Sequence, residues 1–284
     1  MKLTFLGTSA ATSYPLPFCM CQNCQQAKQN GGKDIRKRSS LLINADLVID
    51  MGPDFVTSCF LYQLDPAQIR YALQTHPHSD HFDASILTTR AAEYAAQDVP
   101  LLSLCASKQT IEKMSEMMQG EGYVQNLLDR QDQKRLNIDV FPLELFQTIQ
   151  MGQYRFTAYP TDHDPAVGSC LYSVTEGAAT IFYGTDTVDL TEEVWRSFHT
   201  KGEKFNCLIL DQTYGLNVNG GGHLNANQVL ALIDRMKKEN LLAPGAQIFA
   251  THISHEGNPP HAVLSEEARR IGYDIAYDGL VLTI

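Results

Sequence analysis

The sequence lacks any apolar run long enough to cross a membrane, since a helical span needs about 20 consecutive, mostly apolar residues. The first seven residues contain an apolar stretch that is too short for a secretion signal, and no cleavage pattern follows it. Low-complexity segments and flexible linkers are lacking as well. We therefore expect a cytoplasmic protein without a membrane partner, folded as a single domain over residues 1–284.

Positive charge is scarce, because 22 lysines and arginines stand against 32 aspartates and glutamates, for a formal net charge of -10. An acidic surface repels phosphate backbones, so a long nucleic acid is not the expected substrate. Basic residues gather only in the segment 33–38, which is too short to form a binding stripe. The apolar fraction of 44% is nevertheless sufficient for a buried core.

Histidine is concentrated in one place, where three of the nine histidines stand within the sequence HPHSDH at positions 76–81. In an extended backbone residues i and i+2 point to the same side, so His76 and His78 can bind one cation. If the chain turns within the motif, Asp80 and His81 can face a second cation. Paired cations about 3.5 to 4 Å apart stabilise both the attacking and the leaving oxygen of a hydrolysis. The alternative is a solvated loop rich in histidine.

At these residues the sequence resembles the metallo-β-lactamase superfamily, whose signature is HxHxDH. The resemblance implies an α/β fold, a four-layer αβ/βα sandwich in which two mixed β-sheets lie face to face with helices outside. It also implies a hydrolase centre with one or two metal ions. Asp50, followed by Gly52, matches a superfamily position whose carboxylate orients the histidine loop from behind the ligands. A simple turn residue at the end of a strand is the alternative for Asp50.

Three further candidates, His163, Asp186 and His252, each follow a predicted strand, so a sheet would bring them to one rim. The resemblance implies two metal sites that share Asp186 as a bridge, one made of His76, His78 and His163, the other of Asp80, His81 and His252. Two bridged cations lower the pKa of a bound water towards neutrality and so supply a hydroxide nucleophile. Imidazole and carboxylate ligands suit zinc, manganese or iron, which leaves the metal open.

The seven cysteines are an odd number, and three of them form CxCxxC at positions 19–24. Three thiolates this close can bind one zinc ion but leave its tetrahedron open, so a fourth ligand must come from elsewhere. A buried set of small apolar thiols is the alternative. Together with His252 and a histidine three residues later, the motif resembles the PhnP-type phosphodiesterases, which act on cyclic ribose phosphates. That resemblance implies a structural zinc site formed by Cys19, Cys21, Cys24 and His255.

A glycine run at positions 220–222 precedes His223. The resemblance implies that His223 lies on the leaving-group side of the substrate, where it donates a proton or binds the phosphate. It implies a catalytic role for Asp80 in addition to its role as a ligand. A loop histidine with a capping role is the alternative for His223. We expect His199 and His261 at the surface, and the other four cysteines, Cys59, Cys105, Cys170 and Cys207, in the core.

The chain alternates predicted strands and helices in two halves that meet near residue 150. A helix is predicted over residues 83–96, and the segment 106–136 is predicted to be a helical insertion. Its methionines have the spacing of a helix face and are expected in the core, with a lid over the site as the alternative. The last residues, 274–284, predict a hairpin with Asp278 and Gly279 at its turn.

These features predict a metal-dependent hydrolase, a phosphodiesterase that cleaves a small phosphodiester of the cyclic ribose-phosphate type. Two divalent ions, manganese or zinc with iron as a further option, and one structural zinc are the expected cofactors, and the resemblance suggests a homodimer. Three alternatives share the fold: a nuclease that processes tRNA 3′ ends, a lactone or thioester hydrolase, and a non-catalytic protein of cofactor biosynthesis, as in the pyrroloquinoline quinone pathway. The nuclease would need a basic arm, which the sequence lacks.

Overall fold

Two seven-stranded sheets form the centre of the computed structural model, which describes residues 1–94, 96–122 and 124–284. The first sheet has the order β14-β1-β2-β3-β4-β5-β6, and its strands from β3 to β6 run parallel. Its strands are β1 (Lys2–Gly7), β2 (Ser40–Ile43), β3 (Leu47–Ile49), β4 (Tyr71–Leu73), β5 (Leu102–Ser107), β6 (Ile138–Leu143) and β14 (Val281–Thr283).

The second sheet has the order β13-β12-β11-β10-β9-β8-β7 and mirrors the first in its mixture of directions. Strands β10 to β13 run parallel, whereas β7 to β10 alternate in direction. The strands are β7 (Thr148–Met151), β8 (Tyr154–Pro160), β9 (Cys170–Glu176), β10 (Ala179–Gly184), β11 (Phe205–Asp211), β12 (Leu242–Thr251) and β13 (Asp274–Ile275). Because parallel strands end at one edge, each sheet gathers several loops there.

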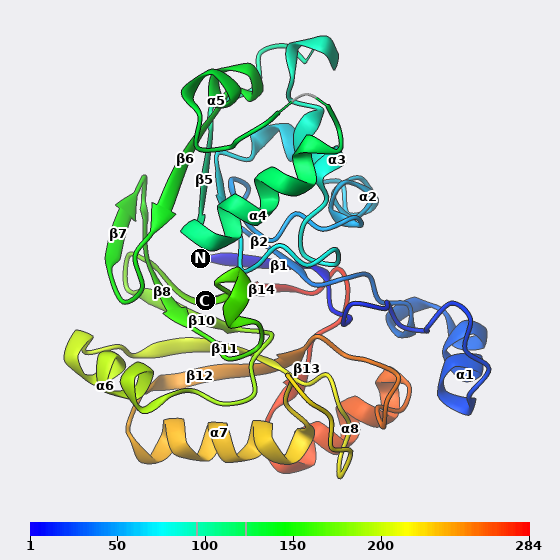
Figure 1. The fold of residues 1–284 in the computed structure, drawn as a ribbon. Helices are drawn as coiled ribbons and strands as arrows, with labels where there is room; N and C mark the ends of the chain where they lie inside the picture. Colours follow the sequence, from blue (N-terminus) through cyan, green and yellow to red (C-terminus); the bar gives the residue numbers. More distant parts are fainter. Residues whose placement is uncertain (95, 123) are drawn as a thin grey trace.

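The two sheets pack face to face and helices cover their outer faces, which confirms the predicted four layers (Figure 1). Leu3 and Phe5 of β1 and Tyr172 and Val174 of β9 belong to one buried apolar cluster between the sheets. The helices are α1 (Gln22–Asn30), α2 (Phe55–Leu61), α3 (Ala84–Thr88), α4 (Lys108–Gln119), α5 (Arg130–Leu136), α6 (Glu192–Lys201), α7 (Ala226–Lys238) and α8 (His261–Ile271), with short 3-10 turns at Gly32–Asp34, Pro66–Gln68, Ala92–Tyr94 and Pro165–Val167. No helix in the described ranges is long and apolar enough to span a bilayer.

Helix α7 shows how local sequence sets the position of a candidate site residue. Asn225 accepts a hydrogen bond from the backbone of Gln228, whose side chain accepts one from the backbone of Asn225, so a capping box begins the helix two residues after His223. The helix then buries one apolar stripe against the second sheet, formed by Val229, Leu232, Ile233 and Met236. Cap and stripe together fix the point at which the chain leaves His223.

The segment 106–136 connects the parallel neighbours β5 and β6 and carries α4 and α5. Met114 and Met118 are fully buried in the core outside the first sheet, as the predicted core packing requires. Within the described ranges the segment is broken between residues 119 and 130 and is not one continuous helix; residue 123 lies outside those ranges. That the segment is an insertion relative to proteins of the same fold stays a prediction.

Two predictions of secondary structure need correction. The helix predicted over 83–96 ends at Thr88, and its residue 95 lies outside the described ranges. The hairpin predicted over 274–284 is wrong, because β13 pairs with β12 whereas β14 pairs with β1 in the other sheet. The carboxylate of Asp278 accepts hydrogen bonds from Thr8 Oγ1 and from the backbone of Lys37, which holds the turn against the first sheet.

His261 is also not at the surface, since it is only 8% exposed. Arg36, from the segment expected to be a basic patch, is buried and donates to His261 Nδ1 at 2.9 Å. His199 is exposed, as predicted, and the four remaining cysteines are buried. An imidazole that accepts a hydrogen bond from a guanidinium must be neutral at that nitrogen, so the fold holds His261 uncharged.

This contact predicts a pH-dependent stability. Burial and the positive charges of Arg36 and Lys33 lower the pKa of His261 to about 4, against about 6.5 in an unfolded chain. Between these values only the unfolded state binds the proton, so the contribution of His261 is complete above pH 6.5 and is lost as the pH falls to 4. Between pH 6.5 and pH 4 the wild type loses this contribution to the free energy of unfolding. We expect His261→Gln to make that loss smaller by roughly 1–2 kcal/mol, a value that allows for the part of the effect screened by solvent.

Urea unfolding at several pH values measures this slope, and His199→Gln is the matched control because its imidazole is exposed. The control should keep the wild-type slope. A wild-type slope in His261→Gln would contradict the assignment of a neutral, buried imidazole.

Candidate metal centre

The predicted ligands meet at the edge where parallel strands of both sheets end. His163, Asp186 and His252 follow the carboxyl ends of β8, β10 and β12, and the motif 76–81 follows β4. The ligand atoms within each of three groups lie within 4.8 Å of one another, and the groups are His76, His78 and His163; Asp80, His81 and His252; and His76, His81 and Asp186. The structure therefore brings together all seven predicted ligands, with Asp186 between the two sites.

Buried polar atoms without hydrogen bonds mark the centre of this group. Among the described residues, Nε2 of His76, His81 and His252 and Oδ2 of Asp186 are buried and have no hydrogen-bond partner. Each such atom costs roughly 1–3 kcal/mol of desolvation when it is left unpaired. Four of them at one place, all imidazole nitrogen or carboxylate oxygen, form a donor set that fits divalent metal ions.

The second ring nitrogen of each imidazole is held by a neighbour. In four of the rings the held atom is Nδ1. His76 Nδ1 lies 2.9 Å from Thr75 Oγ1, and His81 Nδ1 lies 2.7 Å from Asp50 Oδ2. His252 Nδ1 lies 2.7 Å from Thr213 Oγ1, and His163 Nδ1 lies 2.9 Å from the Gly222 carbonyl oxygen. His78 is reversed, because its Nε2 contacts Asp164 Oδ2 at 3.1 Å and its Nδ1 lies 3.3 Å from His163 Nε2. Such contacts set the tautomer of a ligand and aim its free nitrogen at the metal position.

Asp50 lies behind the motif, where it was predicted. Its carboxylate is buried and also accepts hydrogen bonds from the Thr75 backbone at 2.8 Å and from Gln74 Nε2 at 2.9 Å. The backbone of Asp50 is left-handed, with φ of 64°, and Asp186 and His252 have φ of 60°. A non-glycine residue in this region costs about 1–3 kcal/mol and is typical of functional sites. These three side chains are therefore held in place at some cost to the backbone.

The charges of the site favour ionised carboxylates. Burial alone would raise the pKa of Asp80 and of Asp186, but the neighbouring imidazoles outweigh it and hold both pKa values well below the usual range. Burial lowers the pKa of His76 and of His163, so these two rings are neutral at physiological pH. Burial would also lower the pKa of His81, but the carboxylates of Asp80, Asp186 and Asp50 outweigh it and raise that pKa. Neutral imidazoles and ionised carboxylates are the forms that bind a metal ion.

His223 reaches the same site from the loop before α7. Its ring stacks on His252 with centroids 5.0 Å apart, and its Nδ1 lies 2.9 Å from Asp211 Oδ2. Burial lowers the pKa of His223, but the hydrogen bond and the charge of Asp211 outweigh it and raise the pKa to about 9. The Nε2 atom takes no part in these contacts.

Asp211 is the main residue that the sequence analysis missed. It is completely buried and also accepts hydrogen bonds from the backbone of Asp186 and from Thr213. A signal was present in the sequence, since an aspartate directly follows the apolar run 207–210, much as Asp186 comes after a strand of its own. Asp164, which contacts His78, was missed as well.

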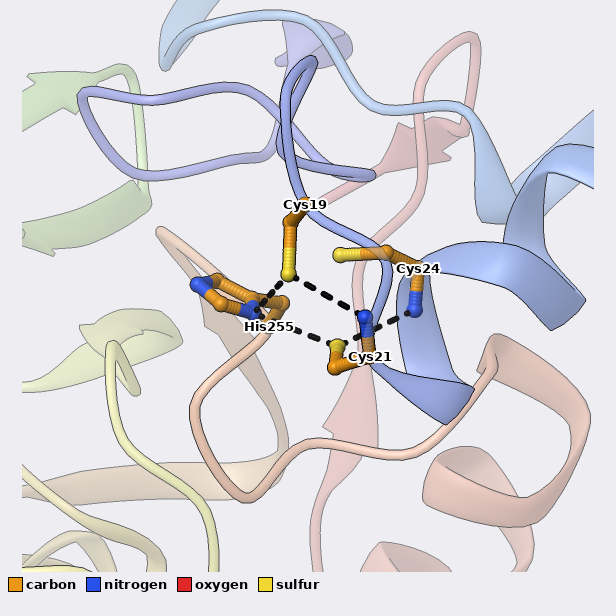
Figure 2. A group of neighbouring side chains, drawn as sticks. All are labelled: Cys19, Cys21, Cys24 and His255. Atoms are coloured by element: carbon orange, nitrogen blue, oxygen red, sulfur yellow. Dashed lines mark hydrogen bonds between the residues drawn. The ribbon is translucent and has the colours of Figure 1, made fainter.

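The three cysteines of CxCxxC and His255 form a second group, at the start of α1 (Figure 2). His255 Nδ1 lies 3.7 Å from Cys19 Sγ and 3.5 Å from Cys21 Sγ, and Cys24 Sγ lies within 4.8 Å of the other ligand atoms. Tetrahedral zinc with bonds of about 2.0–2.3 Å keeps its ligand atoms about 3.5–3.8 Å apart, so the donor set fits zinc. His252 and His255 share one loop, which places this group next to the other centre.

The thiols of this group differ in acidity. Burial raises the pKa of Cys21, but the Cys24 backbone N–H and His255 outweigh it and lower the pKa to about 6. Burial raises the pKa of Cys24 to about 12. In the absence of a metal ion Cys21, the exposed member, is therefore a thiolate at neutral pH, whereas the buried Cys24 is a thiol.

Comparison with known proteins agrees with this geometry. A family model described as a beta-lactamase superfamily domain matches residues 46–253. No curated protein sequence matches the chain. Among solved structures, a diphosphatase of the PhnP family has a TM-score of 0.70 at 19% identity and covers 99% of this chain and 96% of its own. At such identities the likeness concerns the fold.

Two other structures are similar over the whole chain. Zinc-bound PqqB from Methylobacterium extorquens has a TM-score of 0.71 at 17% identity, with 100% of both chains covered. The short form of human tRNase Z has a TM-score of 0.63 at 18% identity and covers 100% of this chain and 99% of its own. These folds carry enzymes with different substrates, so the match leaves the substrate open.

The cysteine group predicts a zinc ion that resists chelation. Three soft thiolates hold zinc more tightly than imidazole and carboxylate ligands do. Mild treatment with a chelator should remove the ions of the histidine and aspartate centre and leave about one zinc per chain. Elemental analysis after gel filtration measures this ratio.

Cys24→Ser should lose the retained zinc, whereas Cys59→Ser, which changes a core thiol, should keep it. If mild chelation leaves the wild-type protein without zinc as well as without the ions of the histidine and aspartate centre, the assignment of a zinc site to the cysteine group is contradicted.

Proposed function

The chain belongs to the beta-lactamase superfamily, and on that premise we propose that it is a metal-dependent phosphodiesterase acting on a small phosphodiester of the cyclic ribose-phosphate type. The observation that carries the proposal is the pair of ligand groups sharing Asp186, with His223 and Asp211 beside them. Two similar structures, a diphosphatase of the PhnP family and a tRNase, are of enzymes that cleave at phosphorus. The group of three cysteines and His255 supports a PhnP-like enzyme in particular.

The residues have distinct roles in this reaction. When bound, two divalent ions, manganese or zinc with iron as a further option, would activate water and neutralise charge on the phosphate oxygens. Asp80, whose carboxylate stays ionised, would bind one of the ions and orient the attacking water by accepting a hydrogen bond from it. His223 donates a proton from Nε2 to the leaving oxygen, while Asp211 holds the proton on Nδ1 and so fixes the tautomer.

The surroundings favour a small substrate. The net charge is -10, and Arg36 of the one basic segment is buried, so the segment offers little to a phosphate backbone. We propose a cytoplasmic enzyme and a homodimer, and we propose that long nucleic acids are not its substrates. Lactone or thioester hydrolysis, tRNA processing and a non-catalytic role in cofactor biosynthesis are the alternatives that an assay must separate.

A comparison of substrates tests the proposal. Bis(p-nitrophenyl) phosphate, a cyclic ribose phosphodiester, a lactone, a thioester and a tRNA precursor are each assayed with added manganese or zinc. We expect metal-dependent turnover of the two small phosphodiesters, and its loss in Asp186→Asn. Faster turnover of the lactone, the thioester or the tRNA would overturn the substrate class, and no turnover of any substrate would favour the non-catalytic alternative.

The role of His223 predicts a dependence on the leaving group. Nitrophenolate leaves without a proton, whereas an alkoxide needs one, so proton donation matters only for the second. We expect His223→Ala to lower kcat for an alkyl ester about 100-fold or more and for a nitrophenyl ester about 10-fold or less. Steady-state kinetics with both esters gives the two ratios.

Asp211→Asn should change the ratios in the same direction, since it leaves the imidazole without its charged partner, and the exposed His199→Ala should leave them unchanged. Equal losses for both esters in His223→Ala would indicate a phosphate contact instead of a proton donor.

A further inference from the structure

Asn258 is a fully buried residue in the loop between His255 and α8. Its side-chain amide donates to the carbonyls of Thr213 and Ser254, both at 3.0 Å. Its Oδ1 accepts a hydrogen bond from Gln212 Nε2 at 3.1 Å. None of the roles assigned above involves this amide, yet both of its ends are fully used.

The orientation of the amide follows from its neighbours. Tyr273 Oη donates to Gln212 Oε1 at 2.6 Å, so the other end of the Gln212 side chain must be its NH₂ group. That group donates to Asn258 Oδ1, and the Asn258 NH₂ group therefore faces the two carbonyls. The network is consistent in one orientation only, since a flipped amide would place oxygen against oxygen.

One side of this network leads to a ligand of the metal centre. Thr213 Oγ1 donates to Asp211 Oδ1 at 2.9 Å and so accepts the Nδ1 proton of His252 at 2.7 Å. This contact leaves His252 Nε2 free for the ion. The Thr213 carbonyl is held in turn by Asn258 Nδ2 and by Ser254 Oγ at 2.7 Å.

The other side leads to the cysteine group. Asn23 lies on α1 between Cys21 and Cys24, and its amide donates to the carbonyls of Asn258 at 3.0 Å and of His255 at 3.4 Å. Asn258 thus accepts a hydrogen bond at its backbone carbonyl from Asn23 of α1, the helix that holds Cys24. Its side-chain amide donates to Thr213, the residue that orients His252.

The loop that carries Thr213 and His223 and the loop that carries His255 and Asn258 are also in direct backbone contact. The Gly215 N–H donates to the Glu256 carbonyl at 2.9 Å, and a Cβ on Gly215 would lie 1.8 Å from the Gly257 carbonyl oxygen. A side chain at position 215 would therefore force apart the loop of His223 and the loop of His255. Glycine is needed here because the backbones approach this closely.

We propose that Asn258 is a positioning residue that couples the cysteine group to the metal site of Asp80, His81 and His252. Filling the cysteine group raises the affinity of that site for its ion and leaves the site of His76, His78 and His163 unaffected, because those rings are held by other neighbours. By reciprocity, the ion at His252 raises the affinity of the cysteine group by the same factor. The inference rests on the metal centre of the proposed function, but not on its substrate.

Asn258→Asp tests this with little change of shape, since it turns the donor that faces two carbonyls into an acceptor. Cobalt(II) is the probe, because sulfur-to-cobalt charge-transfer bands report the cysteine group. In protein whose cysteine group already holds zinc, the visible cobalt bands report the other two sites. In Asn258→Asp we expect the cobalt affinity of one of the two sites of the histidine and aspartate centre to fall about 10- to 100-fold, as for other residues that orient a ligand. The cobalt affinity of the other site should stay unchanged. The matched control is Ser115→Ala, which removes buried hydrogen bonds within the first sheet's helical layer and should change neither site.

The affected site is identified in a second background. In His252→Ala, Asn258→Asp should cause no further loss, because its route to the metal runs through that ring. In His163→Ala, Asn258→Asp should lower the cobalt affinity of the site of His252 by the same factor as it does in the wild-type background. Equal weakening of both sites, no weakening, or full additivity with His252→Ala would overturn the proposal.

Coupling to the cysteine group is measured in the same way. Cys24→Ser should weaken the site of His252 in the wild type and much less in Asn258→Asp, whereas additive effects would overturn the coupling. If Asn258→Asp does not fold, Asn23→Ala breaks the same path near the surface. It should reproduce part of the loss at the site of His252, and unchanged affinity there would overturn the proposal.

Enzyme assays separate this inference from the proposed function. If the wild type cleaves no phosphodiester but Asn258→Asp selectively weakens the site of His252, the proposed function is refuted and the role of Asn258 is supported. Full phosphodiesterase activity with unselective metal loss would refute that role alone.

Discussion

The burial of the Asp186 carboxylate between two groups of imidazoles is the constraint on which the rest of the structure depends. An isolated carboxylate in a protein interior is extremely costly, so it must be surrounded by partners that compensate its charge. Asp186 lies 3.3 Å from the ring nitrogens of both His81 and His252, and these come from opposite halves of the chain. The two sheets must therefore end at the same place, and the apolar core between them holds their edges in register.

The arrangement of the sheets explains why the ligands come from so many loops. Several strands of each sheet end at the same edge, where β4 precedes the motif 76–81 and β8, β10 and β12 precede His163, Asp186 and His252. The ligands are therefore attached to rigid strands, while the carboxylates and hydroxyls behind them, such as Asp50 and Thr213, fix the rings. A site of this kind tolerates changes on its loops better than changes in the contact between the sheets.

The sequence predicted those parts of the site that depend on local spacing or on a strand followed by a polar residue. The motif 76–81 is local, and the fold class and the three downstream ligands followed from the resemblance that it supports. Asn258 was missed because its role depends on tertiary partners for which no local pattern exists. Asp211 does follow an apolar run, but only its tertiary contact with His223 gives it a role. The C-terminal hairpin failed for a similar reason, since Asp278 and Gly279 predict a turn but do not say which strand each arm will pair with.

The left-handed backbone at Asp50, Asp186 and His252 restricts how this centre can evolve. Glycine adopts this conformation readily, and asparagine, aspartate and histidine adopt it more often than other residues. Of these, glycine, asparagine and histidine would remove the negative charge at the aspartate positions. An exchange of one ligand type for another, such as glutamate for aspartate, would require the turn itself to be rebuilt. Descendants of this protein should therefore change substrates by remodelling the rim while they inherit these three residues intact.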